Sequence, residues 1–61
     1  MQEPNVDIYE FTRQVGKVVQ ERYGEVDGDD LCFNLIKSGV IWIEDGVDTA
    51  VLTVAMHMLQ N

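Results

Sequence analysis

The stretch "EVDGDDLCFNLIKSG", residues 25–39, decides the fold because it holds both a turn and a complete helical pattern. Acidic residues crowd the front of this stretch, an apolar run follows, and Gly39 closes it. The residues that recur at helical spacing are Leu31, Cys32, Leu35 and Ile36. The pattern predicts a helix over about residues 29–38 that ends before a glycine. Phe33 falls just beyond the apolar face, so we expect it to be partly exposed.

The acids do not fit a calcium-binding loop. Counted from Asp27, the sixth and twelfth positions of an EF-hand loop are Cys32 and Ser38, where Gly and Glu are required. Instead, "DGDD" at residues 27–30 recurs as "DGVD" at residues 45–48, each time before an apolar run. Asp-Gly-x-Asp resembles a capping box with Asp in place of Glu, and acids in the first turn suit the helix dipole. We therefore predict two helix starts and no metal site.

Upstream, residues 7–23 predict the first helix, with Asp7 as its cap, Glu10 three residues on and Gly24 as its C-terminal cap. Its apolar stripe comprises Ile8, Phe11, Val15, Val18 and Val19. Gly16 in the interior costs roughly 1 kcal/mol relative to alanine. It either permits the close approach of another backbone or is a tolerated weak position.

Downstream, "VIWIEDG" at residues 40–46 favours a short extended or β segment at residues 40–43. Alternation places Ile41 and Ile43 on one side and Trp42 on the other. Since no other strong strand is visible, this segment either packs as coil or pairs with its copy in a second subunit.

The third helix begins at Val47 or Asp48 and ends at Leu59. Its apolar arc spans roughly 240° of the helical wheel, which is wider than a surface helix needs. Only a narrow polar strip interrupts the arc, formed by Thr49, Thr53, His57 and Gln60. Two neighbouring helices cannot cover such an arc, so the pattern predicts a partner or a self-associated dimer.

The 61 residues form one small domain, for which we expect burial of only about 60% of the unfolded surface. Cys32 is the single cysteine, so no internal disulfide can support the fold. We predict a mainly α-helical, three-helix domain over residues 1–61, oligomeric, with residues 1–5 as a flexible N-terminus. Without an apolar run long enough for a membrane span, and without a signal-peptide pattern, a cytoplasmic location is expected.

The formal net charge of −7 predicts a basic protein as partner and disfavours nucleic acid and anionic membranes. If the second and third helices start at the same end of the domain, their acids merge into one acidic rim. Its members would be Glu25, Asp27, Asp29, Asp30, Glu44, Asp45 and Asp48. The apolar candidates for a partner or oligomer interface are Phe33, Trp42, Leu52, Met56 and Leu59.

No phosphate loop, paired-cysteine motif or nucleophile motif is present, and we predict neither an enzyme nor a cofactor. The predicted function is a binding module that regulates or inhibits a protein with a basic surface, by occlusion or phosphate mimicry. Nucleic-acid-handling proteins are one such partner class. A homo-oligomeric assembly module is the alternative, and a small enzyme using Cys32 and His57 ranks third. Small acidic proteins of this kind are frequent in phage and plasmid genomes, which is an association only.

Overall fold

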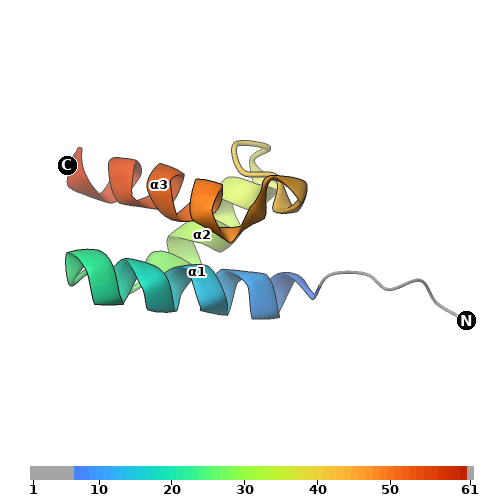
Figure 1. Cartoon of the computed structure of the whole chain (residues 1–61). Coiled ribbons are helices and arrows are strands. Elements are labelled where there is room, and N and C mark those ends of the chain that lie inside the picture. The colour runs from blue at the N-terminus through green and yellow to red at the C-terminus, as the bar shows by residue number, and fades with distance from the viewer. Residues whose placement is uncertain (1–6, 61) are drawn as a thin grey trace, which may run out of the picture.

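A computed structural model describes residues 7–60, which form three α-helices and one short 3-10 helix. The elements are α1 (Ile8–Tyr23), α2 (Gly28–Lys37), η1 (Ile43–Asp45) and α3 (Gly46–Leu59). α1 and α3 lie side by side and run in the same direction, and α2 crosses behind them (Figure 1). The prediction of a mainly helical domain with three helices is confirmed. The predicted flexible N-terminus, residues 1–5, lies outside the described residues.

α1 begins and ends as the sequence predicts, although its N-terminal cap differs in detail. The Asp7 carboxylate accepts a hydrogen bond from the Tyr9 N–H at 3.0 Å. The Glu10 carboxylate accepts a hydrogen bond from the Gln14 amide at 3.5 Å and lies 4.0 Å from Arg13, and no bond from it to the Asp7 N–H is present within the described residues. Gly24 adopts the left-handed conformation (φ +72°) at the C-terminal cap, where glycine carries no steric penalty.

The repeated Asp-Gly-x-Asp motif marks two helix starts, as predicted, because α2 and α3 begin at Gly28 and Gly46. The predicted capping boxes, however, are wrong: neither Asp27 nor Asp45 makes a side-chain cap hydrogen bond. A capping residue adopts extended dihedral angles. Asp27 is left-handed (φ +68°) and Asp45 is already helical (φ −78°, ψ −10°), so both carboxylates stay available at the surface.

The predicted β segment at residues 40–43 is corrected by the structure, which contains no strand between residues 7 and 60. The N–H groups of Val40 and Ile41 both donate to the Leu35 carbonyl, at 2.9 and 3.2 Å. These bonds tie the segment to the end of α2 and use the donors that a ladder would need. Trp42 has extended dihedral angles, and Ile43 already belongs to η1.

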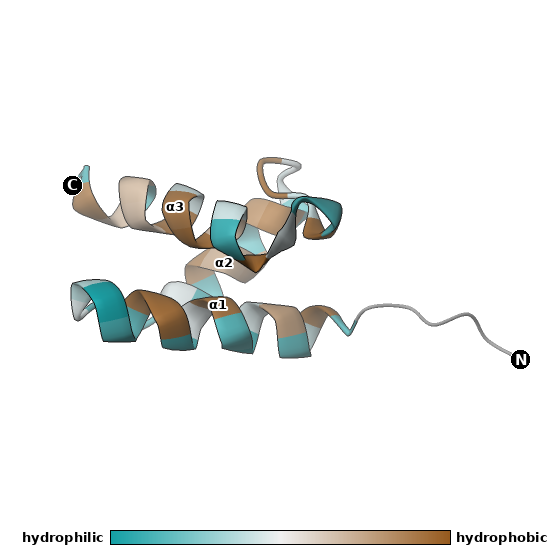
Figure 2. Ribbon diagram, in the orientation of Figure 1, coloured by the Kyte–Doolittle hydropathy of each residue, from teal (hydrophilic) through white to brown (hydrophobic). Residues whose placement is uncertain are grey.

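One apolar core joins the three helices. Its buried side chains are Phe11, Val15, Val19, Cys32, Leu35, Ile41, Ala50, Val51 and Val54. Figure 2 shows brown and pale colours along most of α3, whereas α1 alternates between brown and teal. Between residues 7 and 60, no helix is long and apolar enough to cross a bilayer.

A close crossing of α1 and α2 explains Gly16 inside α1. A Cβ atom at Gly16 would lie 2.8 Å from the Asp29 backbone nitrogen and 2.9 Å from its Cβ. Across the same contact, a Cβ atom at Gly28 would lie 3.3 Å from Val19. Of the two readings of Gly16, the structure supports the close approach of another backbone.

Candidate functional site

The acidic residues that the sequence places in one rim form two separate clusters. We call Glu25, Asp27, Asp29 and Asp30 the α2 acidic cluster, and Glu44, Asp45 and Asp48 the α3 acidic cluster. Three residues of the α2 acidic cluster line a groove together with His57 and Met58, near the end of α3. The α3 acidic cluster lies at the start of that helix, and the eleven helical steps from Gly46 to His57 span about 16 Å. The structure therefore does not bring the seven acids together.

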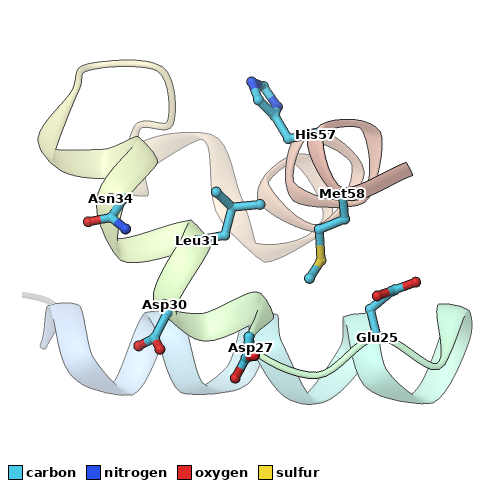
Figure 3. Close-up of a pocket in the computed structure, with 7 residues that line it drawn as sticks. All are labelled: Glu25, Asp27, Asp30, Leu31, Asn34, His57 and Met58. Atoms are coloured by element: carbon cyan, nitrogen blue, oxygen red, sulfur yellow. The ribbon is translucent and has the colours of Figure 1, made fainter. Parts of the chain in front are cut away.

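The groove lies between the first turns of α2 and the last turns of α3 and has a volume of about 470 Å³. Its lining comprises Glu25, Asp27, Asp30, Leu31, Asn34, His57 and Met58. Leu31 and Met58 point into the space between the two helices, while Asp27 and Asp30 project from the start of α2 (Figure 3). We call this feature the acid–apolar groove, because carboxylates border an apolar floor.

Among the described residues, no Lys or Arg side chain lines the acid–apolar groove. Between residues 7 and 60, the one salt bridge joins Arg13 to Glu10. Arg13 also lines a smaller hollow of about 260 Å³ with Asp27 and Asp29, on the side where α1 meets α2. The carboxylates of the α2 acidic cluster thus make no ion pair within the described chain.

A second candidate surface is the outer face of α3. Leu52, Met56 and Leu59 are 56%, 59% and 61% exposed. Their spacing of four and three residues puts them on one face of the helix. Val51 and Val54, by contrast, are completely buried in the core. The three exposed side chains are therefore surface that the domain does not use for its own folding.

The two aromatic candidates, Phe33 and Trp42, differ in how much of each side chain is already packed within the domain. Phe33 is partly buried, as predicted; its ring stacks on Tyr9 with centroids 5.7 Å apart, and the Lys37 ammonium lies 5.3 Å from its centroid. Trp42 is 60% exposed, next to the buried Ile41. Trp42 is consequently the freer aromatic anchor of the two.

The two groups considered for catalysis lie in different environments. Cys32 is fully buried in the core. Burial, and secondarily the charge of Asp29, raise the pKa of its thiol to about 11. His57 is exposed, and its Nδ1–H donates to the Thr53 carbonyl at 3.0 Å. A buried thiol with a raised pKa is a poor nucleophile, so this arrangement favours a structural role for Cys32.

The raised pKa of Cys32 predicts a loss of stability in alkaline solution. Between pH 9 and pH 11, the thiol ionises in the unfolded chain but stays protonated in the folded one. The buried thiol therefore does not lower the free energy of unfolding below pH 9, but lowers it increasingly as the pH rises from 9 to 11. The free energy of unfolding, measured by urea titration across this pH range, should decline more steeply for the wild type than for Cys32→Ala. Parallel pH profiles of the two proteins would contradict the assignment, because Tyr and Lys residues titrate in both.

No group of three or more His, Cys, Asp or Glu side chains within residues 7–60 could hold a metal ion. Comparison with protein-family models, with curated proteins and with solved structures finds no match for this chain. The candidate surfaces are therefore interpreted from their own geometry and charge.

Proposed function

We propose that this chain is a small protein-binding module that regulates or inhibits a protein with a basic surface. The observation that supports this proposal is the acid–apolar groove, where carboxylates that make no salt bridge within the described residues border an apolar floor. Lysine and arginine combine an apolar stem with a charged head group. Such a side chain could lay its stem on Leu31 and Met58 and direct its charge to the carboxylates.

The proposed mechanism is occlusion of the partner's basic surface. The net charge of −7 would steer the two proteins together, and this steering weakens with ionic strength. The α3 acidic cluster, about 16 Å away along α3, would give a second contact that fixes the orientation of the partner. Nucleic-acid-handling proteins such as nucleases and polymerases are a partner class that presents a basic surface, and the carboxylates would there take the place of phosphates.

A matched pair of charge variants tests this proposal. Asp27→Asn/Asp30→Asn removes two charges at the groove, and Glu10→Gln/Glu21→Gln removes two charges from α1. Asn tolerates the left-handed conformation of residue 27, so the groove variant should fold. The partner is captured on the immobilised wild-type chain at low salt and purified, and association rates are then measured by stopped flow.

We expect the groove variant to associate about tenfold more slowly and the α1 variant to change much less. The wild-type association rate should also fall steeply with added salt. Equal effects of the two variants would show that only net charge matters. An association rate that does not depend on salt would contradict the proposal.

A second candidate function, homo-oligomeric assembly, is favoured by a different observation. The outer face of α3 exposes Leu52, Met56 and Leu59 although the core of the domain is complete without them. Contiguous exposed apolar side chains are typical of interaction surfaces. A dimer formed there would leave the acid–apolar groove open, so the two candidates are compatible.

A further inference from the structure

We propose that α3 pairs with α3 of a second copy of this chain in an antiparallel arrangement, about a twofold axis at Met56. The inference rests on the assembly function proposed above and adds its geometry. It is supported by the charge along the helix, the spacing of the exposed side chains and the position of the α3 acidic cluster.

The outer part of α3 is free of charge in a strongly acidic protein. Residues 49–60 contain no Asp, Glu, Lys or Arg, although a quarter of the whole chain is charged. Two copies with a net charge of −7 each repel one another wherever their acids face. Contact through residues 49–60 avoids this repulsion, which makes a second copy an acceptable occupant of the face.

Two polar side chains of α3, Thr53 and His57, each make a hydrogen bond within the helix. The Thr53 hydroxyl donates to the Thr49 carbonyl at 3.1 Å, and the His57 Nδ1–H donates to the Thr53 carbonyl at 3.0 Å. These two donors therefore need no partner across an interface.

The exposed side chains are spaced almost symmetrically. Leu52 precedes Met56 by four residues and Leu59 follows it by three. In an antiparallel pair centred on Met56, each Met56 faces its copy and each Leu52 faces Leu59 of the second copy. A surface that complements itself in this way is what a twofold dimer interface requires.

Repulsion between the two α3 acidic clusters disfavours the parallel arrangement. A parallel pair would place the two α3 acidic clusters next to each other, at the roughly 8–10 Å spacing of packed helices. In the antiparallel pair, Asp48 lies eight residues from the axis on each side, so the two copies of Asp48 are about 24 Å apart along the helices. That separation exceeds the Debye length of about 8 Å at physiological ionic strength, so their repulsion is largely screened.

Cysteine cross-linking tests this geometry directly. Met56→Cys, Leu52→Cys and Leu59→Cys are prepared separately, oxidised mildly and run on a non-reducing gel. A disulfide requires Cα atoms within about 7 Å, which only position 56 meets with its own copy. Wild-type protein, whose Cys32 is buried, controls for cross-linking through that thiol.

We expect M56C to form a disulfide-linked dimer, L52C and L59C to stay monomeric alone, and a mixture of L52C and L59C to form the mixed dimer. Cross-linking of all three variants with themselves would indicate a parallel pair and overturn the inference, while self-association would stand. A dimer mass in solution without cross-linking at position 56 would move the interface elsewhere. If the wild type stays monomeric at high concentration and no variant forms a cross-link, both the antiparallel pairing and the homo-oligomeric assembly function are overturned.

Discussion

Phe11→Ala is expected to remove a large part of the free energy of unfolding of this domain. Phe11 is 5% exposed and belongs to the core that joins all three helices. Truncating a buried phenylalanine costs about 3–5 kcal/mol, because apolar contacts are lost and a cavity remains. A 61-residue domain has a total stability of roughly 3–9 kcal/mol at 0.05–0.15 kcal/mol per residue. The substitution therefore removes much or all of the free energy of unfolding of the domain.

Urea unfolding followed by far-ultraviolet circular dichroism measures this loss. Tyr9→Ala is the matched control, because Tyr9 is an aromatic residue on the same helix but is mostly exposed. Its stacking on Phe33 contributes about 0.5–1.5 kcal/mol, so the control should remain folded. Equal destabilisation by the two substitutions would contradict the placement of Phe11 in the core.

Gly16→Ala is expected to destabilise the domain although alanine is the better helix former. Alanine in a helix interior gains about 1 kcal/mol over glycine. Against this, the new methyl group would lie within 3 Å of the Asp29 backbone nitrogen, which cannot rotate away as a long side chain would. Moving α2 to make room costs about 1–3 kcal/mol by analogy with overpacked cores. The steric cost should therefore exceed the gain in helix propensity.

The same urea experiment decides the sign of this effect. Lys17→Ala is the control, since Lys17 is the exposed neighbour of Gly16 on α1 and its truncation should change stability by less than about 0.5 kcal/mol. A Gly16→Ala protein as stable as the wild type would mean that α1 and α2 do not cross as closely as the structure describes.

The sequence predicted the helices well because their signals are local. The apolar stripe and Gly24 locate α1, and the two Asp-Gly-x-Asp motifs place the starts of α2 and α3. The strand prediction at residues 40–43 failed because β-favouring side chains do not form a strand without a partner. There, the backbone N–H groups of Val40 and Ile41 instead donate to the Leu35 carbonyl at the end of α2.

The candidate sites were less predictable because they depend on how the helices meet. The sequence shows seven acids, but only the fold reveals that α2 starts beside the end of α3 and thereby separates them. Asn34 and Met58 carry no sequence signal for the acid–apolar groove, because the contact between helices brings them there. The exposed residues of α3, in contrast, follow directly from an apolar arc too wide for two neighbouring helices to cover.

Sedimentation equilibrium of the untagged wild-type protein and of Met56→Asp tests most directly whether the outer face of α3 is a docking surface. Met56 is exposed, so the substitution should leave the fold intact, which circular dichroism can verify. Self-association through α3 predicts a mass that rises with concentration towards twice 6.9 kDa for the wild type and stays at 6.9 kDa for Met56→Asp. A wild-type mass of 6.9 kDa at every concentration, or a dimer that survives Met56→Asp, would contradict the assignment of this face.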